Sequence, residues 1–472
     1  MRRKLLWGAF AILLVAGLAV AMLPRWLSGD LSRERLEAIL TEALQREVTI
    51  ESMELAEDAP VVELRGVRVA QPEGLEGPEK RPLLYAGKVQ LEASVEDLME
   101  GRVVGLASAK DVTVVVLERG GETSVHGLGR RKKDGTEPKK PGRTLDLELE
   151  LGEAAVHYVD LDHGEAIELN QIDLRAHLGQ RSGDEGTERD ALATLNAKSL
   201  TVRDIELTKL MVQVRLRDKA LEVVRMQAGV GEGTLSGNAK LLPPDGSKDN
   251  RDWSATLELT DADLDGPLRD IAALTVPWLV RATGAEGAAT TGKLSAKIDV
   301  TGHGLRWKSI LPSLAGSASL KLREVVVPPG SMLATLAKMA GRAEGSWAVG
   351  NVEVDVSMAD QWISPQSIKL GELEPKIRGR ISVEGELDLH VDLFPLVGLF
   401  GGGVYETVAR TTTKLPVRVT GTVHEPKLAP PRVRDVAAGL IGGAVRRALS
   451  SKSEEPDESM KRQPVEPVPP SE

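Results

Sequence analysis

Residues 145–151 have the sequence Leu-Asp-Leu-Glu-Leu-Glu-Leu, and this alternation decides the fold class. Successive side chains of an extended chain point to opposite faces, so the four leucines share one face and the three carboxylates share the other. A strand with one apolar and one charged face is typical of an antiparallel sheet that meets water on one side. The stretch therefore predicts a half-buried β-strand.

The same alternation recurs along most of the chain, with polar or charged residues between the apolar ones. The apolar positions that we assign to one face of a sheet are Leu145, Leu147, Leu149, Val212, Val214, Leu216, Val352, Val354, Val356, Leu387, Leu389, Val391 and Leu393. Turn-forming Gly, Asp, Asn and Pro separate the runs at hairpin spacing. We expect a mostly β fold, in which about 20 strands spaced ~4.8 Å apart extend for roughly 100 Å.

An apolar segment at the N-terminus predicts a membrane anchor. Residues 5–23, with Leu5 and Leu23 at the ends, contain no charged side chain, and a helix needs about 20 such residues to cross a bilayer. Three basic residues precede the segment, so the positive-inside rule places the N-terminus in the cytoplasm and the rest of the chain on the other side. A signal peptide cleaved after Ala21 is the alternative, and both interpretations export the protein.

Composition excludes several classes of function. The chain has no cysteine, which rules out disulfides, thiolate zinc sites and thiol nucleophiles. Its formal net charge is −10, and an acidic chain gives no reason to expect nucleic acid as a partner.

Changes in pattern divide the chain into seven segments. They are 1–27 (cytoplasmic n-region and transmembrane anchor), 28–128 (amphipathic helix and N-terminal β module), 129–143 (basic flexible linker), 144–264 (middle β-meander), 265–431 (C-terminal β module with short helices), 432–450 (amphipathic helix) and 451–472 (disordered tail). Helical spacing recurs at 268–280, 310–314 and 332–339. Residues 180–190 are polar and lack periodicity, so we expect a loop there.

Two local patterns could carry chemistry, and both have a simpler structural explanation. Residues 287–293 nearly match a phosphate-binding loop, but Leu294 stands where a hydroxyl should hold magnesium, and the alternation that follows predicts a strand. Asp160, Asp162, His163 and Glu165 form an acidic cluster that a hairpin turn explains without a metal. We predict no catalytic residue, no metal and no cofactor.

Several β-rich stretches follow the anchor in a fixed order. They are Val48-Thr49-Ile50, then 61–69, 89–95 and 112–117, the hairpin 155–160 with 167–174, and the C-terminal stretches 316–320, 377–381 and 415–423 before Glu425-Pro426. Taken in this order, they resemble the AsmA family of Gram-negative envelope proteins. The family usually has a glycine near the end of its first amphipathic helix, whereas this chain has Gln45-Arg46-Glu47.

The resemblance implies an elongated, curled antiparallel β-sheet groove with a hydrophobic interior and a few short capping helices. It implies a single-pass inner-membrane protein whose bulk lies in the periplasm. Relatives are linked to outer-membrane biogenesis, and larger ones, related to bridge-like lipid-transfer proteins, to movement of phospholipid between membranes. No catalytic residues come with the family.

An apolar face of this extent needs a cover, and the sequence leaves its nature open. Helices are few, and aromatic residues make up only 3% of the chain, which gives little bulk for a closed sandwich core. Aliphatic side chains suit acyl chains, so we expect phospholipid to bind the apolar face. A β-sandwich over part of the chain, a scaffold that assembles outer-membrane proteins by strand addition and, more distantly, a metal-dependent envelope hydrolase are the alternatives.

Overall fold

The computed structural model describes residues 32–55, 61–75, 80–93, 97, 102–128, 145–164, 166–183, 186–202, 205–217, 219–243, 251–273, 290–304, 307–327, 346–371, 374, 376–392, 416–423 and 426–429. Outside these residues lie the predicted anchor with Leu5, Ala21 and Leu23, the whole basic linker at 129–143, the helices at 332–339 and 432–450, Leu393 and the tail. No helix within the described ranges combines the length and the hydropathy needed to cross a membrane.

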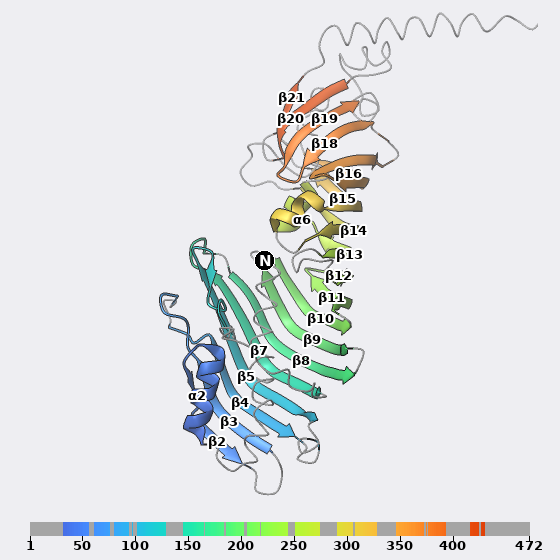
Figure 1. Ribbon diagram of the computed structural model, residues 1–472. Helices are drawn as coiled ribbons and strands as arrows, with labels where there is room; N and C mark the ends of the chain where they lie inside the picture. Colours follow the sequence, from blue (N-terminus) through green and yellow to red (C-terminus); the bar gives the residue numbers. More distant parts are fainter. Residues whose placement is uncertain are drawn as a thin grey trace, which may run out of the picture.

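The described strands form one 21-stranded sheet, accompanied by the helices α2 (Arg33–Leu44), α4 (Gly266–Ala273) and α6 (Trp307–Ser313) (Figure 1). The strands are β1 (Val48–Thr49), β2 (Ser52–Leu55), β3 (Val61–Val69), β4 (Leu84–Ala93), β5 (Val103–Arg119), β6 (Glu122–Thr123), β7 (Leu145–Asp160), β8 (Ala166–Gly183), β9 (Gly186–Val202), β10 (Ile205–Arg217), β11 (Ala220–Val230), β12 (Gly233–Leu241), β13 (Asp252–Asp263), β14 (Thr291–His303), β15 (Ala315–Val327), β16 (Trp347–Ala359), β17 (Trp362–Leu370), β18 (Ile377–Ser382), β19 (Glu386–Asp392), β20 (Pro416–Thr422) and β21 (Pro426–Ala429).

Strands follow one another across the sheet almost in chain order. At one edge β3 pairs with both β1 and β2, and β4 and β5 follow. β7 joins β5 in parallel, and from β7 onward every strand pairs antiparallel with the next as far as β21. The sheet is curled but not closed (Figure 1), which confirms the predicted mostly β, antiparallel fold and not the sandwich.

Register keeps the apolar side chains of neighbouring strands on one face. Leu151 lies opposite Leu174, Leu174 opposite Leu195, and Leu195 opposite Val212, across β7 to β10. Residues directly opposite one another in an antiparallel pair share a face of the sheet. The alternation seen in single strands thus becomes one apolar face that crosses the whole sheet.

Irregular residues in the strands produce part of the curl. Glu153, Lys209, Asp261 and Glu324 have φ between 50° and 55°, a left-handed conformation that glycine usually adopts. Each lies at or next to a register shift between paired strands. Such bulges bend a strand and increase its twist. Four polar residues here adopt the left-handed conformation that glycine commonly supplies at a bulge.

Helix α2 covers the N-terminal end of the apolar face. Leu36, Leu40 and Leu44 recur every four residues and are buried against the first strands. Gln45 ends the helix with φ 53°, and its N–H donates to the Thr41 carbonyl. Gln45 therefore fills, in a left-handed conformation, the place where the resemblance leads us to expect glycine.

The loop predicted at residues 180–190 is wrong, because most of these residues are strand. Gln180 pairs with Arg189, Arg181 with Glu188 and Ser182 with Thr187, so β8 and β9 continue almost to their connection. Backbone hydrogen bonds extend the two strands beyond the apolar alternation, and polar sequence carries no periodic signal of that extension. Of the short helices, α6 covers most of 310–314, and α4 covers the described part of 268–280.

Candidate functional site

The predicted apolar residues lie on one face, but their burial differs along the sheet. Leu147 and Leu149 belong to a buried cluster that extends from α2 to β11. Val352, Val354, Val356, Leu387, Leu389 and Val391 belong to a second cluster, formed by strands β14 to β20 with α4. Val212, Val214 and Leu216 are only half-buried. The structure describes the backbone of Leu145 but not its side chain.

Between the two clusters lies a band of half-buried apolar side chains, which we call the central strip. It consists of Val214, Leu216, Leu221, Val223, Leu235, Ala239, Leu241, Trp253, Leu257, Ile298 and Val300, on strands β10 to β14. These residues belong to neither buried cluster. Five strands at ~4.8 Å spacing make the strip roughly 20 Å wide.

Rows of paired residues build the strip. Leu216 lies opposite Leu221, Leu221 opposite Leu241, and Leu241 opposite Trp253. A second row runs from Val214 through Val223, Ala239 and Ala255 to Val300. Every backbone group of these rows faces a neighbouring strand, so the strip offers apolar side chains and little hydrogen-bonding capacity.

The described helices lie at the borders of the strip. Helix α2 belongs to the first cluster, Ala272 of α4 belongs to the second, and α6 contacts β14 (Figure 1). Neighbouring side chains of one register row shield one another's sides from water, which accounts for their partial burial. They remain partly exposed, whereas Val352 and Val354 in the second cluster are 0% and 1% exposed.

The opposite face of the same strands is charged. Lys293 Nζ lies 2.6 Å from Asp263 Oδ1 and 2.5 Å from Glu232 Oε2, and these two carboxylates raise the pKa of Lys293 above its usual value. Arg323 pairs with Asp261, and this contact lowers the pKa of Asp261. The sheet thus separates a wet, ion-paired face from an apolar one.

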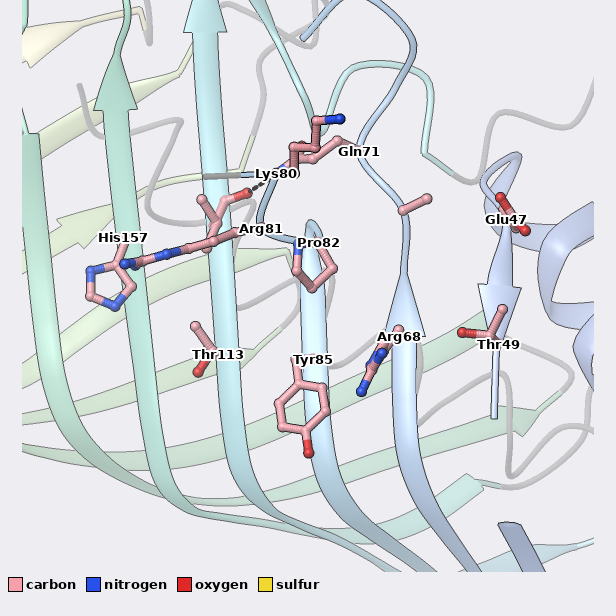
Figure 2. Close-up of a pocket in the computed structure, with 12 residues that line it drawn as sticks. Glu47, Thr49, Arg68, Gln71, Lys80, Arg81, Pro82, Tyr85, Thr113 and His157 are labelled. Carbon is pink, nitrogen blue, oxygen red and sulfur yellow. Dashed lines mark hydrogen bonds between the residues drawn. The ribbon is translucent and has the colours of Figure 1, made fainter. Parts of the chain in front are cut away.

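A polar cleft of about 860 Å³ lies on the charged face near the first edge of the sheet (Figure 2). Thr49, Arg68, Tyr85 and Thr113 form one register row across β1, β3, β4 and β5. Arg68 lies 5.7 Å from the centre of the Tyr85 ring. Sequence patterns missed this row because it depends on strand register.

Described residues between β3 and β4 line one side of the cleft. The Gln71 amide Nε2 donates to the Val115 carbonyl at 2.9 Å, and the Arg81 side chain extends toward His157 (Figure 2). Acidic groups oppose the cations: Glu47 lines the cleft, and Glu51 pairs with Arg68 at 2.8 Å. The cleft is therefore mixed in charge.

The two motifs that resembled chemical sites have structural roles. Lys293, which ends the phosphate-loop-like stretch, lies inside strand β14, as the alternation predicted. The Asp160 carboxylate accepts the backbone N–H groups of Asp162 and His163 at 3.0 and 3.2 Å, which stabilises the turn after β7. Glu165 lies outside the described residues, within which no cluster of His, Asp and Glu is arranged to hold a metal.

Comparison with known proteins assigns the chain to no group: no protein-family model matches it, and no curated protein matches it.

Proposed function

We propose that this protein binds phospholipid on its central strip and shelters the acyl chains without catalysing any reaction. It does so as an inner-membrane-anchored protein whose bulk lies in the periplasm, where it supports outer-membrane biogenesis. The observation that carries the proposal is the half-buried aliphatic band between two buried clusters.

Uncovered aliphatic surface is a source of binding free energy. Full burial of a Val or Leu side chain is worth about 1.5 to 3 kcal/mol, so a half-buried one leaves roughly 1 kcal/mol unrealised. The nine Val, Leu and Ile side chains of the strip offer on the order of 10 kcal/mol before the costs of ordering a ligand are subtracted. Contiguous apolar surface of this kind usually marks an interaction site.

The chemistry of the strip favours acyl chains over a polar ligand. Val, Leu, Ile and Ala line it, and the only side-chain hydrogen-bonding group among its eleven residues is the indole of Trp253. A polar ligand would lose its hydration there without gaining partners. An acyl chain needs apolar contact alone, and a curled sheet that is not closed can admit a long ligand from the side.

The N-terminal sequence supports the location. Residues 5–23 are uncharged and apolar and follow three basic residues, which is typical of a single-pass anchor with a cytoplasmic N-terminus. The resemblance to AsmA proteins adds the inner membrane, the periplasm and outer-membrane biogenesis to this interpretation.

Photo-crosslinking in cells tests the proposal at adjacent residues of β10. A benzophenone amino acid at Val214 faces the strip, and one at the exposed Arg215 faces the charged side. We expect phospholipid adducts from position 214 and few from position 215. Equal labelling at the two positions, or protein adducts alone at position 214, would contradict the proposal that the strip binds lipid.

The second candidate is a scaffold for outer-membrane proteins, and the open edge of the sheet favours it. Among the described strands β21 pairs only with β20, so its outer backbone groups are free to receive an added strand. A probe at the exposed Lys427 on β21 would capture partner proteins if this candidate is correct. Lipid at 214 without protein at 427 favours the first candidate.

A further inference from the structure

One end of the central strip carries two buried hydrogen-bond donors that find no acceptor among the residues the structure describes. The strip ends there in the row Leu216, Leu221, Leu241 and Trp253, and Arg251 precedes Trp253 by two residues. Alternation along β13 therefore places Arg251 on the same face as Trp253, one step beyond the apolar row. The border between apolar surface and water lies between these two side chains.

Trp253 combines a tightly packed apolar ring with a polar Nε1 atom that has no hydrogen-bond partner among the described residues. The ring packs on Gly302 of β14, where an added Cβ would lie 2.4 Å from Trp253 Cζ2. Its Nε1 is buried and finds no hydrogen-bond acceptor among the described residues. Buried indole N–H groups usually have a partner, so this one indicates an acceptor that arrives with a ligand.

Arg251 presents a second donor at the same border. Its Nε is also buried without an acceptor, and Nη1 donates to the Lys219 carbonyl at 3.4 Å, which directs the guanidinium toward the turn between β10 and β11. No carboxylate within the described ranges pairs with Arg251, and the nearby Asp252 contacts His303 instead, at 2.6 Å. Lys219 itself is exposed in that turn.

The other end of the same strands differs on this face. There the apolar face continues in Leu259, Ala296 and Leu294, and the nearby cations Lys293 and Arg323 lie on the opposite face, paired with carboxylates. Among the described residues, a cation therefore borders the apolar strip at the Arg251 end and not at the other end, and this difference gives a bound amphiphile a direction.

We propose that Trp253, Arg251 and Lys219 bind the phosphate head group of the lipid whose acyl chains lie on the central strip. This inference rests on the proposed function and adds the head-group class and the lipid's orientation. Phosphate oxygens accept hydrogen bonds from guanidinium, ammonium and indole groups, and those from the two cations are charge-assisted. Tryptophan suits the position because its ring is apolar and its N–H is polar.

Two fluorescent lipids that differ only in the head group test the inference. The full-length chain in dodecylmaltoside micelles is titrated with pyrene-labelled phosphatidylglycerol and with a pyrene-labelled diacylglycerol that carries the same chains. We expect the phosphate-bearing probe to bind about tenfold more tightly, the scale of a charge-assisted hydrogen bond. The double variant Arg251→Gln with Lys219→Gln removes this preference and leaves diacylglycerol binding unchanged.

Conservative variants distinguish a loss of head-group binding from a loss of folding. Trp253→Phe keeps a ring on Gly302 and loses the N–H, so we expect phosphatidylglycerol binding to fall roughly threefold. Lys219→Gln changes only an exposed side chain and should lower the affinity for phosphatidylglycerol by a similar factor. The matched control is Arg215→Gln, which removes a cation from the charged face of β10 and should change neither affinity.

The outcomes separate this inference from the proposed function. A preference for phosphate that survives in the double variant and in Trp253→Phe, or no preference in the unaltered chain, overturns the head-group site while lipid binding stands. Failure of both probes to bind the unaltered chain overturns the proposed function, and the head-group site with it.

Discussion

An aspartate placed in the strip should be tolerated far better than one placed in a buried cluster. Val223 on β11 and Val354 on β16 are both valines on the apolar face of the sheet. Val354 is 1% exposed, whereas Val223 is half-buried. The pair Val223→Asp and Val354→Asp therefore compares identical chemistry in two environments.

The expected free-energy changes follow from burial. An unpaired carboxylate at position 354 has no route to water, and an uncompensated buried charge costs about 3 to 5 kcal/mol. At position 223 the carboxylate reaches solvent at the open side of the strip. The loss there is part of the burial of one valine and some β propensity, about 1 to 2 kcal/mol.

Urea unfolding of the full-length variants in one detergent measures the difference. We expect Val354→Asp to shift the midpoint at least twice as far as Val223→Asp, and Val354→Ala to lie between them. Equal, large shifts for the two aspartate variants would mean that the strip is covered like a core, and the reasoning from partial burial would be refuted.

Three further predictions concern the scaffold. Leu40→Ala, on the buried side of α2 at a position 1% exposed, should lower the free energy of unfolding by about 2 to 5 kcal/mol, and a urea midpoint unchanged from the unaltered chain would contradict the packing of α2. Lys209→Val places a β-branched residue at φ 50° and should cost about 1 kcal/mol or more, whereas Lys209→Gly should be neutral or stabilising; the reverse order in thermal melting would exclude the bulge. Glu63 has a pKa lowered from 4.5 by hydrogen bonds from Lys88 and Arg65, so it stabilises the fold above pH 4.5 and loses that effect as pH falls through its lower folded pKa. Melting of Glu63→Gln should accordingly depend less on pH in this acidic range, and an unchanged dependence would argue against the contact.

The sequence was sufficient to predict the strands and the apolar face that they share. The alternation at residues 145–151 requires one wet and one apolar side whatever the register. Strand β7 and the other strands with the same alternation could therefore be predicted from the two-residue period alone. The same logic failed at residues 180–190, where backbone pairing continues through polar sequence. Hydrogen bonds between main chains leave no trace in side-chain type.

The strip itself could not be predicted, because Val214 and Val354 have the same local pattern. Their difference in burial depends on which strands curl toward one another, and the bulges that bend the strands occur at Glu153 and Lys209, residues without any signature of left-handed backbone. The donors at Trp253 and Arg251 were also missed. Only register and packing show that they border an apolar row.

Native mass spectrometry of the full-length chain, released from membranes in mild detergent, tests the central claim most directly. The account predicts bound phospholipid in the unaltered chain and in Arg215→Asp, and its loss in Val214→Asp, which places the charge one residue away on the opposite face. A chain that carries no lipid, or a Val214→Asp variant that retains as much lipid as Arg215→Asp, would contradict the account.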